Sequence, residues 1–240
     1  MFYRPDNRPQ AIFFGSIGTL VDTTELQRRA FNAAFQGAGL GWRWDRSLFN
    51  ALLKTVGGVA RIESFAESRG EVVDASAIHA QKSQIFQMML GHETMELRPG
   101  VADVLSAAAR QAVPLAFVTT TSRANVDAIL SSVRTEISAE TFAVVIDRSM
   151  VAAPKPHPEA YQLALTKMGV ESASVLAIED TVECAQSAVD AGIKTLCHLS
   201  EYAGDPPKSP DRSLQGLHLV DRITPELCGL SPAFQFKTAV

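Results

Sequence analysis

The chain has 240 residues, of which 46% are hydrophobic and 20% are charged, and its formal net charge is −4. This composition is that of a globular protein with a large core, and the lack of a basic stripe excludes nucleic acid as a partner. No apolar run reaches the roughly 18–20 residues that a membrane span needs, so we expect no membrane partner. The three cysteines include no CxxC pair and the N-terminus is not that of a signal peptide, which favours a cytoplasmic location.

An apolar run at residues 11–14 predicts a buried first strand. The pattern then changes, because apolar residues in the stretch 23–94 recur at helical spacing, as Ile85, Met88 and Met89 do. Glycines separate these apolar runs and mark helix ends or turns. The stretch therefore predicts an inserted all-helical unit of about four helices, called the cap below.

After Arg98-Pro99-Gly100 the expected strands and helices alternate. The expected strands are 114–118, 142–146, 174–178 and 194–199. The expected helices are 101–108, 124–130, 159–168 and a run over 182–189 that Gly192 closes. Such alternation predicts an α/β, Rossmann-like fold in which helices cover both faces of a parallel sheet, with the first strand in its centre. We expect residues 1–22 and 95–240 to form this core and residues 23–94 to form the cap.

The loops that follow parallel strands meet at one edge of a sheet, and ligands bind there. Four loops should meet in this way: residues 15–19, 119–121, 153–158 and 179–181. Thr119 can donate a hydrogen bond to a phosphoryl oxygen, Lys155 can neutralise its charge, and Asp180 offers the hard oxygen ligand that Mg²⁺ prefers. Each residue also has a purely structural explanation, namely a strand-end hydroxyl, a solvated loop lysine and a helix N-cap.

The motifs AIFFGSIGTLVDT, VTTTS, APKPHPEAY and IEDTVECAQSAVDAGI occur in this order, and LLKTVGGVARI lies in the cap. With them the chain resembles the haloacid dehalogenase-like superfamily, in the branch that holds the CbbY-type sugar-phosphate phosphatases and β-phosphoglucomutase. The resemblance implies that phosphate is bound by Gly18, Thr119, Thr120 and Lys155, metal by Asp180 and Glu179, and substrate by a cap loop with Gly57, Gly58 and Arg61.

The resemblance also implies two aspartates in the first motif, a nucleophile that binds Mg²⁺ and an acid–base group two residues later. Gly15 and Ile17 stand at these positions. Glycine cannot form a phosphoenzyme and isoleucine cannot transfer a proton, so we expect no intact catalytic residue and a weakly held or absent Mg²⁺. Neither Ser16, expected to point away, nor Asp22, expected to begin the linker to the cap, replaces them.

Three further positions depart from the pattern of this branch. Gln27 stands where the first cap helix often has a histidine, Val59 where the cap loop usually has a lysine, and Cys184 where the fourth motif has a glycine. These changes lie around the expected site, so they add to the doubt about turnover that the first motif raises.

Three functional interpretations stay open. In the first, the chain is an inactive homologue of a sugar-phosphate phosphatase that binds phosphate, a small phosphorylated metabolite or a protein. In the second, it is a weak phosphatase or phosphomutase. In the third, it is a structural or regulatory subunit. A turnover assay separates the second from the others. A ligand-induced rise in melting temperature separates the first from the third, because a ligand that binds only the folded state stabilises it.

Overall fold

The computed structural model describes residues 8–15, 17–55, 57–133, 137–199 and 216–231. A six-stranded, all-parallel sheet forms its centre, in the order β3-β2-β1-β4-β5-β6. The strands are β1 (Ala11–Phe14), β2 (Leu115–Val118), β3 (Val144–Ile146), β4 (Val175–Glu179), β5 (Lys194–Cys197) and β6 (Leu217–Leu219). The predicted parallel sheet with an interior first strand is confirmed, whereas β6 was not foreseen.

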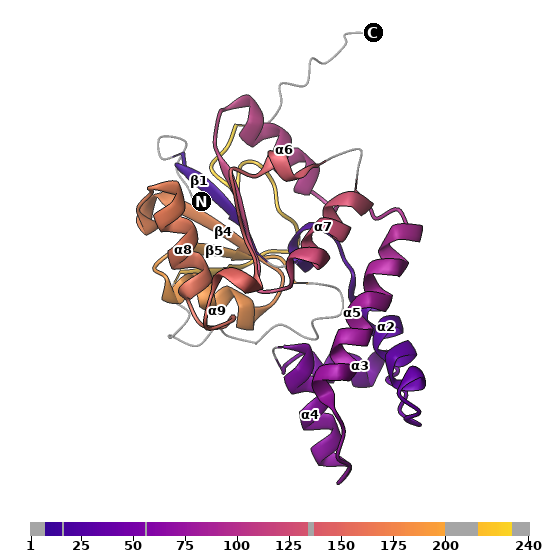
Figure 1. Ribbon diagram of the computed structural model, residues 1–240. Coiled ribbons are helices and arrows are strands. Elements are labelled where there is room, and N and C mark those ends of the chain that lie inside the picture. The colour runs from indigo at the N-terminus through magenta and orange to yellow at the C-terminus, as the bar shows by residue number, and fades with distance from the viewer. Residues whose placement is uncertain (1–7, 16, 56, 134–136, 200–215, 232–240) are drawn as a thin grey trace.

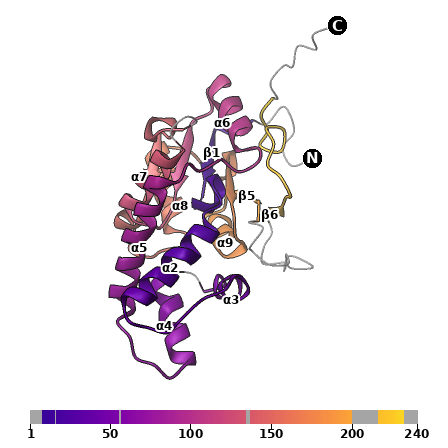
Figure 2. The ribbon, with the colours of Figure 1, turned by 90° about the vertical axis from the view of Figure 1, so that its right-hand side faces the viewer.

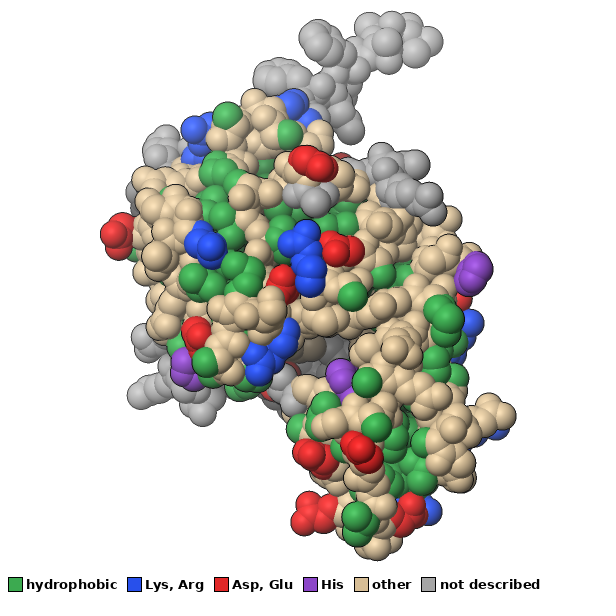
Figure 3. All heavy atoms as spheres, in the orientation of Figure 1, with side chains coloured by type: hydrophobic (Ala, Val, Ile, Leu, Met, Phe, Trp, Pro, Cys, Tyr) green, Lys and Arg blue, Asp and Glu red, His purple; other side chains and the backbone are tan. Residues whose placement is uncertain are grey.

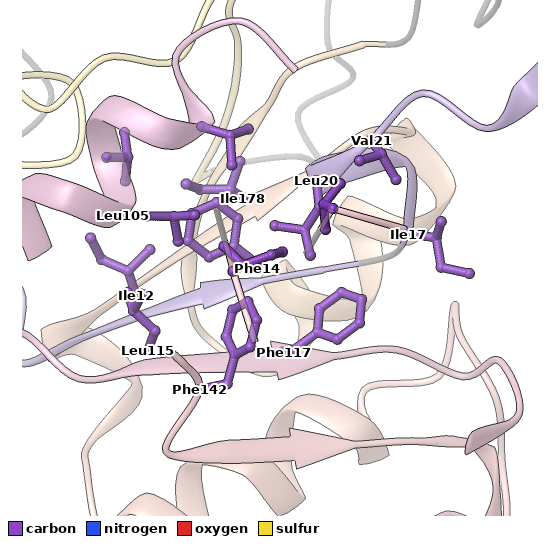
Figure 4. Packing of buried hydrophobic residues seen from close by; sticks show 14 of the residues in the cluster. Ile12, Phe14, Ile17, Leu20, Val21, Leu105, Leu115, Phe117, Phe142 and Ile178 are labelled. Atoms are coloured by element: carbon purple, nitrogen blue, oxygen red, sulfur yellow. The ribbon is translucent and has the colours of Figure 1, made fainter. Parts of the chain in front are cut away.

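Helices cover both faces of this sheet because the side chains of each strand alternate between them. Ile12 and Phe14 pack with α6 (Val101–Arg110) and α7 (Arg123–Ser132), whereas Ala11 and Phe13 pack with α8 (Glu159–Met168) and α9 (Val182–Asp190). Figure 4 shows the first of these clusters, in which Phe14 lies among side chains from the neighbouring strands and helices. The carboxyl ends of the strands are thereby held in one rigid edge.

The cap helices follow a short helix, α1 (Ile17–Leu20), which begins just after β1. They are α2 (Thr24–Gly37), α3 (Arg46–Leu52), α4 (Gly58–Ser68) and α5 (Ala75–His92). Figures 1 and 2 show these four helices grouped together below the sheet. Phe31, Phe35, Trp44 and Phe49 form an aromatic cluster among them, while Phe86 of α5 packs into the core cluster.

The predicted apolar face of α5 is partly wrong. Its buried residues recur every three to four positions and are Ala75, Ile78, Lys82, Phe86 and Leu90. Met88 is 60% exposed, because two positions along a helix from Phe86 lead to nearly the opposite side. Ile85 and Met89 flank the buried face and are partly buried.

Three 3₁₀ helices complete the described structure: Ala139–Thr141, Arg148–Met150 and Ser172–Ser174. The three cysteines, Cys184, Cys197 and Cys228, are free thiols. Within the described ranges, no helix has both the length and the apolar character that crossing a bilayer requires.

Candidate functional site

A cavity of about 1000 Å³ lies between the carboxyl edge of the sheet and the cap. The surface is visibly indented where the cap joins the sheet-containing part (Figure 3). Of the predicted site residues, the structure brings to its walls Ile17, Gly18, Gly57, Gly58, Arg61, Thr119, Thr120, Lys155 and Asp180. Gly15 and Glu179 do not line the cavity, but Glu179 lies against Gly15 and bonds to Lys155.

Lys155 is engaged by groups of the protein itself. Its ammonium donates to Glu179 Oε1 at 2.5 Å and to the carbonyl of Val118 at 2.7 Å, and it lies 4.7 Å from the ring centre of Tyr161. Tyr161 donates its hydroxyl to the same carboxylate oxygen at 2.7 Å. Burial, reinforced by Glu179, raises the pKa of Tyr161. The side chains of Lys155 and Glu179 are 2% and 0% exposed, so this is a desolvated ion pair.

Gly15 makes the ion pair sterically possible. The amide of Gly15 donates to the carbonyl of Ile178 at 2.8 Å, which places Gly15 beside Glu179 on the neighbouring strand. A Cβ atom on Gly15 would overlap the carboxyl group of Glu179, far inside van der Waals contact. The Glu179 carboxylate therefore occupies the space that a side chain at position 15 needs.

Ile17 belongs to the apolar interior as much as to the cavity. Its side chain is 7% exposed and joins the core cluster, at whose edge it lies in Figure 4. Ser16 lies outside the described residues. Asp22 accepts a hydrogen bond from the amide of Thr24 at 2.9 Å, which is consistent with its predicted place at the start of the cap.

The threonine loop and Gly18 form the polar wall beside the ion pair. The Thr119 hydroxyl is almost fully buried and accepts the amide of Thr121 at 3.2 Å, whereas Thr120 is half-buried. The Asp180 carboxylate lies against Gly18, because a Cβ atom there would overlap it. Thr119 and Thr120 thus offer hydroxyls, while Asp180 gives this wall a negative charge.

The residues present do not fit a magnesium ion. Mg²⁺ requires near-octahedral oxygen ligands, usually including one or two carboxylates. Among the described residues, the side chains that could hold a metal ion together are Glu179, Asp180 and Cys184, and Glu179 already accepts hydrogen bonds from Lys155 and Tyr161. Burial, followed by the charge of Glu179, raises the pKa of the Cys184 thiol to about 12. Asp180 is then the one hard ligand of the three that remains, beside a neutral thiol and a carboxylate engaged with Lys155, and this is a poor set of ligands for a hard cation.

The cap end of the cavity carries two buried cations. Lys82 and Arg61 are 4% and 8% exposed, and neither forms a salt bridge with a carboxylate in the part of the chain that the structure describes. Lys82 lies 4.8 Å from the ring centres of Phe31 and Phe86 and donates to Gln27 Oε1 at 3.3 Å.

Arg61 is held by the cap loop that the sequence singled out. Its guanidinium donates to the carbonyls of Leu52 at 2.9 Å and Thr55 at 3.0 Å, and its backbone amide donates to the carbonyl of Gly57. Burial lowers the pKa of Arg61 to about 10. Burial, with the charge of Arg61 adding to it, lowers the pKa of Lys82 to about 7.

Sequence reasoning missed Lys82, although a signal was present. The lysine lies four residues after Ile78 and four before Phe86, on the buried face of α5. A lysine is rarely buried there unless it binds a partner or a ligand. It also missed Asn50, whose Oδ1 atom is buried without a hydrogen-bond partner among the described residues. No periodic pattern identifies Asn50 in advance.

The chain is similar to known proteins in sequence. A sequence model of haloacid dehalogenase-like hydrolases matches residues 9–192. The chain is 37% identical over 196 residues to Protein CbbY of Cereibacter sphaeroides, which covers 80% of this chain and 85% of that protein. It is 38% identical over 197 residues to "Protein CbbY, plasmid" of Cupriavidus necator, covering 78% of this chain and 77% of that protein.

Solved structures give the same result. CbbY from Rhodobacter sphaeroides in complex with phosphate aligns with a TM-score of 0.79 at 33% identity, over 89% of this chain and 94% of that one. A mutant of that protein in complex with xylulose-(1,5)bisphosphate gives the same values. The resemblance that the motifs predicted is therefore confirmed.

Proposed function

The chain belongs to the haloacid dehalogenase-like hydrolase family, and we propose that it binds a phosphorylated sugar without hydrolysing it. The observation that carries this proposal is the first motif, where Gly15 and Ile17 provide neither a nucleophile nor a proton-transfer group. Loss of a nucleophile alone costs about 10⁶ in kcat in the protease subtilisin. The cavity nevertheless keeps hydroxyls and buried cations, which are groups that hold phosphate.

The spread of the polar groups supports a ligand with an anionic group at each end. Thr119 and Thr120 lie at the sheet end, and Arg61 and Lys82 at the cap end, of one cavity. The half-buried amide of Asn50, which also lines the cavity, suits a sugar hydroxyl. The solved structure of the CbbY mutant contains xylulose-(1,5)bisphosphate, a sugar with two phosphates. We therefore propose a sugar bisphosphate as the ligand class.

A melting experiment tests the binding half of the proposal. Xylulose 1,5-bisphosphate should raise the melting temperature of the wild type more than xylulose 5-phosphate does, because it reaches both ends of the cavity. At 100 times its Kd, a ligand stabilises the folded state by about 2.7 kcal/mol. The change Lys82→Met should remove the preference for the bisphosphate. No shift with either sugar would favour the structural or regulatory subunit.

A turnover assay tests the catalytic half. Phosphate release from either sugar should stay at background in purified protein with and without Mg²⁺. Release at about 1 s⁻¹ or faster, near the low end of ordinary enzymes, would establish a working phosphatase. Loss of that release in Asp180→Ala would exclude a contaminating enzyme.

A further inference from the structure

We propose that Glu179 has taken over the place of the side chain missing at position 15, so that its ion pair with Lys155 stands in for a metal centre. Anion binding in the cavity is then independent of divalent metal. The part of this inference that concerns anions rests on the proposed function, whereas the part that concerns metal stands by itself. Glu179 acts through Lys155 and is a positioning residue.

The sheet explains why Glu179 reaches position 15. β1 and β4 are neighbours, with Phe14 paired to Ile178, so the next residues, Gly15 and Glu179, also lie side by side. Neighbouring strands are about 4.8 Å apart, which is within reach of a glutamate side chain. The carboxyl group lies where a Cβ atom of residue 15 would be, and only glycine leaves that space open.

The charge of Lys155 explains why Glu179 stays there. A lysine that is 2% exposed needs an anion or a full set of acceptors, because burial of an unpaired charge is costly. Position 15 supplies no carboxylate, so Glu179 provides the anion, and Val118 and Tyr161 complete the contacts of the ammonium. Lys155 and Tyr161 both bind Oε1 of Glu179, so a metal ion that drew this carboxylate out of its place would leave Lys155 without its counter-charge.

The same contacts predict how the site responds to metal. Mg²⁺ and Lys155 compete for the carboxylate of Glu179. Lys155 has the advantage in this competition, because it is part of the folded chain and does not have to be bound from solution. The nearby thiol of Cys184 does not offset the loss, since thiols suit softer metals. Phosphate would then contact hydroxyls and the ion pair of Lys155 with Glu179. The net charge of this pair does not change when Mg²⁺ is added.

Titration of metal in the wild type, Gly15→Asp and Gly15→Ala tests the inference. Both changes expel Glu179, but only aspartate returns a carboxylate to Lys155. The wild type should bind Mg²⁺ too weakly for calorimetry at millimolar concentrations, whereas Gly15→Asp should bind it measurably. Gly15→Ala should melt roughly 5–15 °C below the wild type, because Lys155 loses its partner, and Gly15→Asp should regain part of this loss.

Phosphate affinity provides the second measurement, with inorganic phosphate as the probe. Its Kd for the wild type should be the same in EDTA and in Mg²⁺, while Mg²⁺ should tighten binding to Gly15→Asp about tenfold, within the usual range of coupling between sites. If no variant binds phosphate, the proposed function fails, and the metal titration still decides the place of Glu179.

Two results would overturn the inference. One is submillimolar Mg²⁺ binding by the wild type that Asp180→Asn abolishes. The other is a Gly15→Ala variant as stable as the wild type, which would mean that Glu179 does not fill the space. Should the variants at position 15 fail to fold, Glu179→Gln replaces them, since it keeps the shape but not the charge. That variant should also melt below the wild type and gain no metal affinity.

Discussion

Each end of the cavity contains a buried lysine, and the two lysines differ in whether a carboxylate of the protein neutralises their charge. At the sheet end, Lys155 is paired with Glu179. At the cap end, Lys82 contacts aromatic rings and an amide, is repelled by the charge of Arg61, and has no carboxylate partner among the described residues. Both lysines are almost fully buried. The comparison teaches that burial alone does not identify a ligand-binding cation. The paired lysine belongs to the architecture, and we expect the one without a carboxylate partner among the described residues to bind an external anion.

The largest effect should follow from breaking the pair at the sheet end. Glu179→Ala should lower the free energy of unfolding by about 3–5 kcal/mol, because it leaves the Lys155 charge buried and uncompensated. Urea unfolding measures the change. Glu179→Gln is the matched control and should cost less, since its amide oxygen still accepts from Lys155. Equal stability of Glu179→Ala and the wild type would remove the contrast between the two ends.

The next effect concerns the other altered position of the first motif. Ile17→Asp should lower the free energy of unfolding by about 2–3 kcal/mol, because it places a carboxylate at a 7%-exposed position beside the core. Ile17→Val, which removes one methylene, should cost about 1 kcal/mol. An Ile17→Asp variant as stable as the wild type would show that position 17 opens to solvent. Both aspartates of the first motif could then be restored with less loss of stability than the burial of Ile17 indicates.

A smaller effect of opposite sign should appear at the cap end. Lys82→Met should raise the free energy of unfolding by about 1–2 kcal/mol, because it replaces a buried cation with an apolar side chain of similar length. The same change should weaken sulfate binding by roughly tenfold or more, since a hydrogen bond to a charged group is lost. Stability gained together with affinity lost is the sign of a functional residue. A loss of both would assign Lys82 to the fold.

The smallest effect is a pH dependence of anion binding at the cap end. Lys82 has a pKa of about 7, which lies below its ordinary value, so it loses its charge as the pH rises through 7. Arg61, with a pKa of about 10, stays charged, and His79, with a pKa lowered by burial to about 4, stays neutral. Gln27 and Phe31 of α2 add no charge.

Sulfate is the suitable probe because it does not titrate in this range. Its affinity should fall about tenfold between pH 6 and pH 8.5, which corresponds to a shift of about one pKa unit on binding. The profile of Lys82→Met should be flat. A wild-type profile without a step near pH 7 would show that another group provides the charge.

The stability of the protein should follow the same titration. Because the pKa of Lys82 is lower in the folded chain than in the unfolded chain, the unfolded chain binds more protons between about pH 7 and pH 10.5. The contribution of Lys82 to stability therefore rises with pH through this window. The advantage of Lys82→Met should shrink accordingly as the pH is raised.

The parts of the fold that depend on periodicity could be predicted from the sequence. The apolar runs located β1 to β5, and the helical spacing located the cap. β6 has only three residues, one of them an exposed histidine, and offers no apolar run. The division into residues 1–22 with 95–240 and residues 23–94 stays a prediction, and one helix, α5, contributes to the interior on both sides of it.

The site was predictable in its location but not in its internal pairing. The motifs correctly indicated which strand-end loops meet, because a parallel sheet fixes their order. They assigned Glu179 to a metal, which stays a prediction, and they gave no sign that its carboxylate lies at Gly15 and binds Lys155. A missing side chain leaves a space, and which neighbour fills it depends on distances between strands that a linear motif does not contain.

The Glu179 carboxylate beside Gly15 has a consequence for the history of the chain. Any mutation of Gly15 to a larger residue must first expel that carboxylate from its partner Lys155. A return to aspartate at this codon alone therefore passes through a strained protein that still lacks the proton-transfer group at position 17. The filled space therefore opposes the change, because an aspartate at position 15 requires the Glu179 carboxylate and its partner Lys155 to rearrange.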